Sequence, residues 1–398
     1  MTDVQGRRAI VVGGSLGGLT TALLLRDAGF DVDVFERTDT VLDGRGSGIV
    51  LQPDTVRWIV ERHAETSLEA MSTEASVVRY IGADNRIVHE EPAGWRFTSW
   101  TTLYRILLGD FGQDRYHLGE FAAGVSQDAN GAVVRFTSGR TERADLIVFA
   151  DGISSTARRR LLPEVTPVYS GYVGWRGTVP EGRLSPTTHA LIADALGYSF
   201  GPSTHICMYP IPGFGGELDA GKRLLNYVWY RNVPAGPDLD ELLTDVAGFP
   251  CPVSVHPGRV QERFVREMRS AAARDLAPAA AELVNCTEQP FLQVVLDVEV
   301  PQMAFGRIAI LGDAAFAARP HAAAGTAKAA ADAWTLADAL RAADGDVPRA
   351  LEGWQEGQLK TGRALAERVQ AMGRRSQFTN DWDPADPELH FGLYGPGK

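Results

Sequence analysis

Lysine is the residue type that this sequence most plainly lacks. Among 398 residues it occurs at Lys222, Lys328, Lys360 and Lys398, and none of these stands in a GxxxxGK[ST] motif. A P-loop nucleotide triphosphatase is therefore excluded, because its phosphate-binding loop needs that lysine. With 39 basic against 50 acidic residues, the formal charge is -11. This charge repels a phosphate backbone, so we expect no nucleic acid partner.

Cysteine and long apolar runs are also scarce. Cys207, Cys251 and Cys286 are odd in number, far apart and without CxxC spacing, which argues against a disulfide framework or a zinc site. We expect no metal site. The sequence has no stretch of about 18 apolar residues and no charged segment leading into a long apolar region. With 44% hydrophobic and 22% charged residues, it predicts a soluble, cytoplasmic globular protein with no membrane partner.

The first 36 residues have the pattern of a βαβ unit. Residues 8–12 (RAIVV) form a short apolar run, as a buried parallel strand does. Residues 13–18 (GGSLGG) turn the chain, and apolar residues at helical spacing follow, up to a capping Gly29. Residues 31–36 (DVDVFE) then alternate and end in Glu36. This order predicts two parallel strands joined by a right-handed helical crossover.

Two later apolar segments end in the same way. Residues 144–150 (ADLIVFA) are followed by Asp151-Gly152, and residues 307–311 (RIAIL) by Gly312-Asp313. A single Gly–Asp pair is more often a plain turn. Ligands of open α/β sheets, however, bind outside the carboxyl ends of the strands. Three such endings therefore predict that distant segments of the chain meet at one ligand.

The middle and the end of the chain have a different pattern. Residues 167–233 are rich in alternating aromatic and β-branched types, which favours a mostly antiparallel sheet. Residues 325–343 and 347–372 have helical spacing. We predict an α/β fold: a Rossmann-like nucleotide-binding domain, a mostly antiparallel β-sheet substrate domain and a C-terminal helical segment. The nucleotide-binding domain is assigned to residues 1–75, 98–165 and 285–345. The substrate domain is assigned to residues 76–97 and 166–284, and the C-terminal helical segment to residues 346–398.

The turn at residues 13–18 departs from the GxGxxG dinucleotide-binding pattern. Gly13 and Gly18 match it, but Ser15 stands where the second glycine lets the backbone approach a pyrophosphate. A serine still allows this approach if its hydroxyl donates to a phosphate oxygen. Glu36 is placed to accept hydrogen bonds from an adenosine ribose, with a solvated strand end as the alternative.

Taken together, these segments resemble the class A flavin-dependent aromatic hydroxylases, the p-hydroxybenzoate hydroxylase-like superfamily. The resemblance rests on the first 37 residues, on ADGISSTAR (150–158) and on GDAA (312–315), and it covers nearly the whole chain. It implies that the Rossmann-like domain binds FAD and that NADH or NADPH is the co-substrate. The segments WRFTSW (95–100), GYVGWRG (171–177), YPIPG (209–213) and RPHAAAG (319–325) are most similar to the branch that hydroxylates 2,6-dihydroxypyridine.

The resemblance also implies which residues contact the cofactor. The family's glycine turn falls on Gly13, Ser15, Leu16 and Gly18, its ribose-binding acid on Glu36 next to Arg37, and its flavin-contacting loop on Gly48. Its RxxL arginine falls on Arg105, its DG motif on Asp151, Gly152 and Arg158, and its ribityl-binding acid on Asp313. Its flavin-facing loop falls on Pro320, Gly325, Thr326 and Ala327. The last loop opens a helix, whose free N–H groups and positive dipole suit the flavin N1/O2 edge. Phe316 and Ala327 stand where the family often has histidine and asparagine. Because the first lysine is Lys222, we discount the related flavin-dependent halogenases.

Catalysis in this family implies two requirements for the protein. Oxygen is transferred through a flavin C4a-hydroperoxide, so the site must exclude water and provide a base for the substrate hydroxyl. His321, next to Pro320, is the candidate catalytic base because imidazole titrates in a suitable range; the alternative is a hydrogen bond to a loop carbonyl. The candidate substrate-binding residues are His205, Tyr209, Tyr227, Gln52 and Arg176, each with ordinary packing or a surface or domain-seam position as the alternative.

We therefore expect an FAD- and NAD(P)H-dependent monooxygenase that hydroxylates a small electron-rich N-heteroaromatic ring, with a hydroxypyridine favoured and O2 as the second substrate. A phenolic acid, a purine-like ring or a polycyclic biosynthetic ring is the alternative substrate. A flavin- or NAD-binding redox module without turnover is the alternative of another class. The resemblance implies a homodimer.

Overall fold

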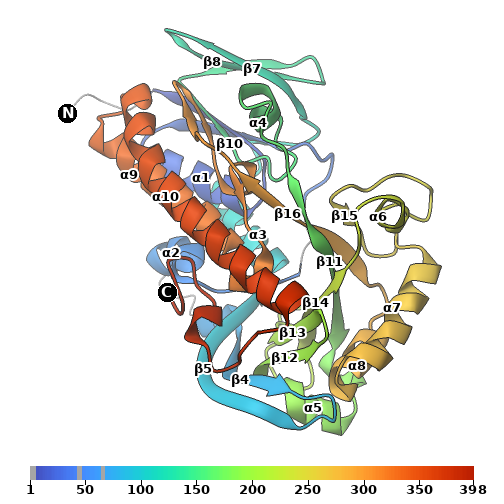
Figure 1. Cartoon of the computed structure of the whole chain (residues 1–398). Coiled ribbons are helices and arrows are strands. Elements are labelled where there is room, and N and C mark those ends of the chain that lie inside the picture. Colours follow the sequence, from blue (N-terminus) through green and yellow to red (C-terminus); the bar gives the residue numbers. More distant parts are fainter. Residues whose placement is uncertain (1–5, 43–46, 64–67) are drawn as a thin grey trace.

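The computed structural model describes residues 6–42, 47–63 and 68–398. Within these ranges, the chain forms a six-stranded, a ten-stranded and a three-stranded sheet. Figure 1 shows that two long helices, α9 (Gly325–Ala342) and α10 (Val347–Arg374), run beside the first two sheets. The predicted α/β fold, with a C-terminal helical segment, is confirmed.

The six-stranded sheet brings the three strand endings together. Its order is β17-β18-β10-β1-β2-β6, with bounds, in that order, of Ala304–Phe305, Ile308–Ile310, Leu146–Phe149, Arg8–Val12, Asp31–Phe35 and Tyr116–His117. β17 pairs antiparallel with β18, and all the other pairings are parallel. The carboxyl ends of β1, β10 and β18 therefore lie side by side at one edge, as the sequence predicted.

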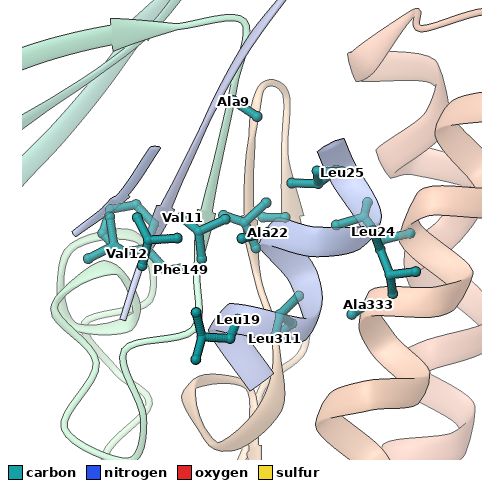
Figure 2. Close-up of a cluster of buried hydrophobic side chains, with 14 of the residues drawn as sticks. Ala9, Val11, Val12, Leu19, Ala22, Leu24, Leu25, Phe149, Leu311 and Ala333 are labelled. Atoms are coloured by element: carbon teal, nitrogen blue, oxygen red, sulfur yellow. The ribbon is translucent and has the colours of Figure 1, made fainter. Parts of the chain in front are cut away.

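Helix α1 (Leu16–Asp27) is buried between this sheet and α9. It is apolar almost all round, which is the pattern of a helix enclosed by protein. In Figure 2, Leu24 on α1 points toward Ala333 on α9, while Leu19 and Ala22 lie toward the sheet. Leu19, Ala22 and Leu24 are all fully buried. Helix α3 (Trp100–Phe111) packs on α1. This core holds the start of α1 at the edge where the strands end.

The ten-stranded sheet is mostly antiparallel. Its path is β15-β16-β11-β14-β13-β12-β4-β5-β3, and β19 (Phe316–Ala317) pairs with β16 off this path. The strands of the path are, in that order, Ser254–Val255, Phe291–Glu299, Val168–Pro180, Leu224–Asn232, Thr204–Ile211, Ala195–Gly201, Thr73–Ile81, Ile87–Ser99 and Gly48–Val50. The pairing of β12 with β4 is parallel, and the others are antiparallel.

The two faces of this sheet have different neighbours. On one face, Tyr227 and Trp229 pack against α7 (Glu262–Asp275), α8 (Pro278–Asn285) and α5 (Pro186–Ile192). The opposite face carries Tyr172, Cys207, Tyr209, Val228 and Tyr230, and we call it the inner face. The split follows from strand alternation, because successive side chains point to opposite faces.

The remaining elements complete the outline of the fold. The other helices are α2 (Pro53–Arg62), α4 (Thr156–Leu161) and α6 (Pro237–Leu242), and the three-stranded sheet consists of β7 (Ala122–Asp128), β8 (Gly131–Phe136) and β9 (Thr141–Ala144). Short helical turns lie at Leu68–Met71, Glu181–Arg183, Gly312–Ala314, Pro320–Ala322, Arg375–Thr379 and Pro387–Leu389. The C-terminal tail then returns over the inner face, where Trp382 Nε1 donates to the Tyr80 hydroxyl at 3.3 Å.

The sheet pairings differ from the expected division into domains in all three ranges of the Rossmann-like domain. β3 and the first residues of β4 fall in the range 1–75, the last two residues of β5 in 98–165, and β16 and β19 in 285–345. All these segments are hydrogen-bonded into the ten-stranded sheet. The division of the chain into domains otherwise stays a prediction. No helix of the described ranges combines the length and apolarity needed to cross a membrane.

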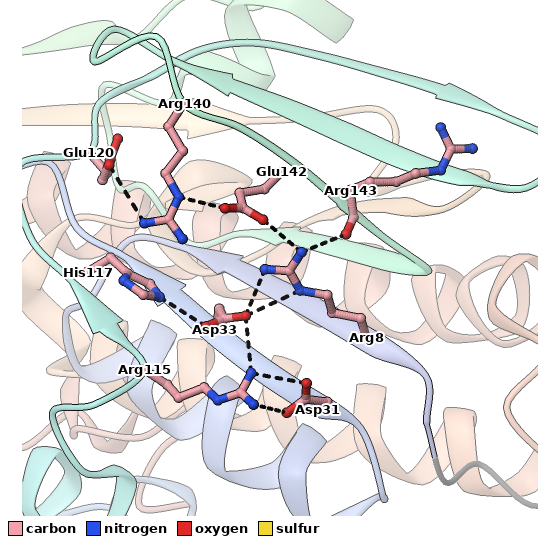
Figure 3. A network of polar contacts seen from close by, with 9 residues as sticks. All are labelled: Arg8, Asp31, Asp33, Arg115, His117, Glu120, Arg140, Glu142 and Arg143. Carbon is pink, nitrogen blue, oxygen red and sulfur yellow. Dashed lines mark hydrogen bonds and ion pairs between the residues drawn. The ribbon is translucent and has the colours of Figure 1, made fainter.

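Ion pairs link β1 and β2 of the six-stranded sheet to the β8–β9 hairpin. Arg8 pairs with Asp33 at 2.9 Å and with Glu142 at 2.7 Å, and Asp33 also contacts His117 and Arg115 (Figure 3). Burial alone raises the pKa of Asp33, but its hydrogen bonds with His117 and Arg8 outweigh this effect and lower that pKa. The Asp33 carboxylate is therefore ionised near neutral pH, and the ion pairs link β1 and β2 to β9.

Candidate active site

The turn after β1 requires glycine at both ends. Gly13 has φ +106°, and a Cβ on it would lie 2.3 Å from the Ala150 carbonyl oxygen. A Cβ on Gly18 would lie 1.8 Å from the Gly13 carbonyl oxygen. Neither position tolerates a side chain, so the first turn of α1 packs directly against the ends of β1 and β10. Ser15 is the N-cap residue of α1, and in the described chain its side chain accepts no capping hydrogen bond.

Glu36 fastens the end of β2 to this turn. Its side chain is buried, and its carboxylate accepts hydrogen bonds from the backbone amides of Gly14 at 2.8 Å and Thr38 at 3.0 Å. The sequence placed Glu36 at the ribose of a dinucleotide. The structure puts it at that edge, with part of its acceptor capacity already used by the backbone. Arg37 follows as an exposed residue.

The DG motif lies at the end of β10. One carboxylate oxygen of Asp151 accepts from the Thr156 amide at 2.7 Å, while the other is buried without a hydrogen-bond partner in the described ranges. Arg158 is also buried and donates to the carbonyl of Ala314 at 2.8 Å and to that of Ile153. Arg158 therefore ties the loop after β10 to the segment after β18.

Asp313, three residues after the end of β18, borders a hollow at this edge. The hollow is lined by Arg176, Tyr230 and Pro320, among others. Asp313 is an exposed residue that lines this hollow. Desolvation by the surrounding protein raises the pKa of Asp313 to about 6, against the opposing charges of Lys328 and Arg158.

The N-terminus of α9 opens toward the same edge. Its N-cap residue, Ala324, offers no side-chain cap, so the amides of the first turn need other partners. A Cβ on the exposed Gly325 would meet nothing within 4 Å among the described atoms. Thr326 is half-buried and Ala327 is buried. Two helix N-termini without side-chain caps, those of α1 and α9, thus lie at the ends of β1 and β18.

These features fit FAD. The start of α1 suits a pyrophosphate because free N–H groups and the helix dipole favour an anion. Asp151 offers an unpartnered carboxylate oxygen and Asp313 an accessible one, as a ligand with many hydroxyl groups needs. The start of α9 offers donors to the edge of a polar ring. Arg105 is an exposed residue of α3 with a contact of its own.

The inner face of the ten-stranded sheet forms a second wall of the candidate site. His205 is buried, contacts the Gln377 side chain at 2.9 Å through Nδ1 and stacks on Phe200. The Tyr209 hydroxyl donates to the Gly48 carbonyl at 3.0 Å. Tyr227 lies elsewhere: it faces α7 and α8 on the opposite face. The expectation that Tyr227 lines a pocket with His205 and Tyr209 is corrected, because alternation along β14 turns its side chain away.

Gln52 and Arg176 both lie beside the inner face. The Gln52 side-chain amide donates to the carbonyl of Ala323 at 2.8 Å, and its oxygen is buried without a partner in the described chain. Arg176 donates to the Ser47 hydroxyl at 2.9 Å, while its Nε has no partner there. Both side chains keep hydrogen-bonding capacity for a ligand. Cys207, also on the inner face, is held as a thiol, because burial raises its pKa to about 12.

His321 is enclosed by aromatic rings rather than held in an open loop. It is 4% exposed, and its ring centroid lies 4.7 Å from that of Tyr230 and 5.4 Å from that of His205. Its Nε2 is 2.7 Å from the Tyr172 hydroxyl. Burial, followed by the nearby His205 and Arg319, lowers the pKa of His321 well below its ordinary value. The imidazole is therefore neutral at physiological pH, and its basicity is weaker than the sequence suggested.

Sequence reasoning missed several residues of this space. Asn226 is fully buried, accepts from the Gly48 amide at 3.0 Å and leaves its own amide nitrogen unpartnered within the described ranges. A polar residue in an otherwise apolar strand was the available signal. Tyr172 and Gln377 were missed as well, because they reach His321 and His205 from segments far away along the chain. Arg319, two residues before His321, was also missed; it contacts the Tyr172 hydroxyl.

Comparison with known proteins shows the family of this chain. A family model described as an FAD binding domain matches residues 7–200, and another, described as FAD binding domain-like, matches residues 169–297. The chain belongs to this FAD-binding family, within the class A flavin hydroxylase superfamily. It is an FAD-dependent monooxygenase with NAD(P)H as electron donor.

The relatives include a protein named 2,6-dihydroxypyridine 3-monooxygenase from Paenarthrobacter nicotinovorans. It is 40% identical over 97% of this chain and 96% of its own. The solved structure of 2,6-dihydroxypyridine-3-hydroxylase from Arthrobacter nicotinovorans superposes with a TM-score of 0.92 at 40% identity, covering 98% of each chain. A 6-hydroxynicotinate 3-monooxygenase from Pseudomonas fluorescens is 27% identical over 85% of this chain and 83% of its own.

Proposed function

We propose that this enzyme hydroxylates a small electron-rich N-heteroaromatic ring, a hydroxypyridine such as 2,6-dihydroxypyridine. The observation that carries the proposal is the 40% identity, over 97% of the chain, to a protein named for that reaction. The proposal requires the local chemistry of the inner face to suit such a ring.

The inner face supports this substrate in two ways. Flat side chains such as Tyr209 and Tyr230 are buried there, and they stack well on a planar ring. Unpartnered polar atoms of Gln52, Asn226 and Arg176 offer both acceptors and donors. A hydroxypyridine carries hydroxyl groups and a ring nitrogen around a small ring, so it pairs with such mixed polar groups. A purely apolar ring leaves them unsatisfied, which is costly for buried groups.

The cofactor contacts remain part of the proposal. FAD supplies the oxygen-activating chemistry when it is bound. The chain's own task is to hold it: the turn Gly13–Gly18 and the start of α1 at the pyrophosphate, Glu36 at the ribose, Asp313 at the ribityl chain and the start of α9 at the ring edge. Tyr172, Tyr230 and the returning tail exclude water from the inner face.

Substrate-stimulated NAD(P)H oxidation tests the proposal. Purified holoenzyme is mixed with 2,6-dihydroxypyridine, 6-hydroxynicotinate, 3-hydroxybenzoate or urate, and hydroxylated product and hydrogen peroxide are both measured. The expected result is rapid oxidation with product formation for the hydroxypyridine. If a phenolic or purine-like ring gives coupled product and the hydroxypyridine does not, the substrate proposal is wrong. If no ring stimulates oxidation, a redox module without turnover replaces it.

The homodimer is a separate proposal, which rests on the family resemblance alone. Light scattering of the purified holoenzyme measures the molar mass directly. We expect twice the chain mass of 43.0 kDa, and a value equal to the chain mass would refute the dimer.

A further inference from the structure

Four side chains form a polar chain that ends at His321. Asp297 on β16 pairs with Arg319 through Nη2 at 2.7 Å and through Nε at 3.0 Å. Arg319 Nη1 lies 3.5 Å from the hydroxyl of Tyr172 on β11, and that hydroxyl lies 2.7 Å from His321 Nε2. Tyr172 is fully buried. The chain thus runs from a half-buried carboxylate to a buried imidazole.

Donor and acceptor chemistry gives this chain a direction. A guanidinium group has donors and no acceptor, so the Tyr172 hydroxyl must accept from Arg319. That hydroxyl has one proton, and its 2.7 Å contact to His321 Nε2 is much shorter than the 3.5 Å contact to Arg319. We therefore assign this proton to the short contact, with Nε2 as the acceptor. A neutral imidazole with an unprotonated Nε2 carries its proton on Nδ1.

The protonation states around His321 keep this arrangement in place. Burial raises the pKa of Tyr172 to about 12, against the opposing effect of Arg319, so the phenol keeps its proton at assay pH. The groups that face the imidazole are Tyr172, Tyr230, His205 and Arg319, and burial together with His205 and Arg319 lowers the pKa of His321. The imidazole therefore stays neutral, with one proton to place.

The protonated nitrogen has no partner in the protein. His321 Nδ1 is buried and without a hydrogen bond among the described residues. The residue before it, Pro320, lines the hollow that also contains Arg176, Tyr230 and Asp313. A buried N–H group without a partner is unfavourable, so a ligand oxygen that accepts from it is bound more tightly.

We propose that Asp297, Arg319 and Tyr172 are positioning residues that fix the Nδ1–H tautomer of His321, and that His321 donates this hydrogen bond to a ring oxygen of the substrate. This role rests on the proposed function and replaces the one that the sequence suggested: His321 acts as a donor, not as the proton-accepting base. A hydrogen bond donated to a hydroxypyridine oxygen favours the anionic ring, and the anion is the more electron-rich form.

The tautomer is measured directly and without substrate. Holoenzyme with isotopically labelled histidine gives a long-range proton–nitrogen correlation spectrum, in which the two neutral tautomers have different patterns. The His321 signals are identified by their loss in His321→Asn. We expect the Nδ1–H pattern in the wild type and a mixture of tautomers in Tyr172→Phe. An Nε2–H pattern in the wild type overturns the proposal, whatever the substrate is.

The matched control is Tyr169→Phe. Tyr169 lies on the same strand, and its hydroxyl donates to the Val233 carbonyl at 2.9 Å. Tyr169→Phe removes a hydroxyl of the same type without touching His321, so we expect the His321 tautomer to be that of the wild type. A mixture of tautomers in this control as well assigns the effect to sheet disruption and contradicts the proposal.

Binding of 2,6-dihydroxypyridine to oxidised enzyme, without NAD(P)H, tests the donor role. The ultraviolet spectrum of the bound ring reports its ionisation. We expect Tyr172→Phe to weaken binding of the anion in proportion to the Nδ1–H fraction that is lost, about twofold for an even mixture. His321→Gln should weaken it by about tenfold, the loss of one charge-assisted hydrogen bond. The amide of His321→Asn stands near the position of Nδ1 and that of His321→Gln near Nε2. The donor role predicts that Asn retains more anion binding than Gln, whereas equal loss in both variants overturns it.

These measurements separate two kinds of failure. If the wild type binds no hydroxypyridine, the proposed substrate is wrong, and the correlation spectrum still decides whether the Tyr172 contact sets the tautomer. If the wild type hydroxylates the ring but His321 has the Nε2–H pattern, the substrate is right and the donor role is wrong.

Discussion

Gly373 of α10 lies directly against the hydroxyl of Tyr172. A Cβ on Gly373 would come within 2.4 Å of that oxygen and 2.9 Å of His321 Nε2. Glycine weakens a helix interior relative to alanine by roughly 0.5–1 kcal/mol. The lower helix propensity of glycine is tolerated at position 373 because a larger residue would leave no room for the contact between Tyr172 and His321.

Gly373→Ala is therefore expected to destabilise the enzyme by about 1–3 kcal/mol, the usual range for overpacking, despite the higher helix propensity of alanine. Denaturant unfolding of the holoenzyme measures this change. Gly357 in the same helix is the control: it is exposed, and a Cβ there meets nothing within 4 Å of the described chain. Gly357→Ala should be neutral or slightly stabilising, and equal destabilisation by both substitutions would contradict the steric argument.

Asp313 gives FAD affinity a dependence on pH. Its pKa is raised to about 6 by desolvation, and a hydrogen bond from a ribityl hydroxyl favours the ionised form. FAD affinity should therefore rise as pH increases through about 6 and level off above it. Asp313→Asn removes the titration and should leave a flat, weaker profile, measured by the quenching of flavin fluorescence on binding.

The folding stability of the FAD-free protein should change in the opposite sense. The unfolded aspartate ionises near its ordinary value, below the folded pKa of Asp313, so stability falls as pH rises between about 4 and about 6. Asp338→Asn is the control, on an exposed position of α9. A step in FAD affinity that persists in Asp313→Asn would assign it to another group.

Lys328 and Asp332 form a buried ion pair inside α9. Nζ lies 2.6 Å from one carboxylate oxygen and 2.7 Å from the other, both side chains are at most 1% exposed, and Asp332 also accepts from the Gly312 amide. Lys328→Met leaves that carboxylate buried and uncompensated, which should cost about 3–5 kcal/mol. Unfolding in denaturant checks the value.

The double substitution Lys328→Met with Asp332→Leu distinguishes the effect of the unpaired charge on stability from the effect of the lost contacts. It should recover most of the stability, because no buried charge remains unpaired. FAD should still bind more weakly, since the Gly312 amide before Asp313 has lost its acceptor. A double variant that is no more stable than Lys328→Met would show that packing, and not the unpaired charge, limits stability.

Substitution of Gly13 tests whether FAD binding needs the close approach of the turn after β1 to the end of β10. Gly13→Ala should abolish tight FAD binding, because its Cβ would overlap the Ala150 carbonyl and φ is positive. Flavin retained after gel filtration is the measurement. Gly109 in α3 is the control, since a Cβ there meets no described atom within 4 Å. Gly109→Ala should retain the flavin.

The convergence of β1, β10 and β18 was predictable because the rule is local. An apolar run ending in glycine and acid marks the carboxyl end of a parallel strand, and parallel neighbours share that edge. The position of Asp313 after β18 and the N-terminal position of Gly325 on α9 follow the same logic.

The inner face was less predictable. Alternation along β14 says that Tyr227 and Asn226 face opposite sides, but the sequence does not say which side is covered by α7 and α8. The state of His321 depends on Tyr172 and His205, which approach from strands more than 100 residues away. Burial by distant segments sets its proton affinity, and no local pattern encodes it.

The order of the six-stranded sheet has a consequence for biosynthesis. β10 lies between β1 and β18, and the loops after all three strands belong to the FAD site that we propose. An emerging polypeptide exposes the glycine turn at residues 13–18 long before α9, on the opposite side of the proposed site, has left the ribosome. Flavin loading must then follow translation, and a chain terminated before residue 307 should emerge colourless.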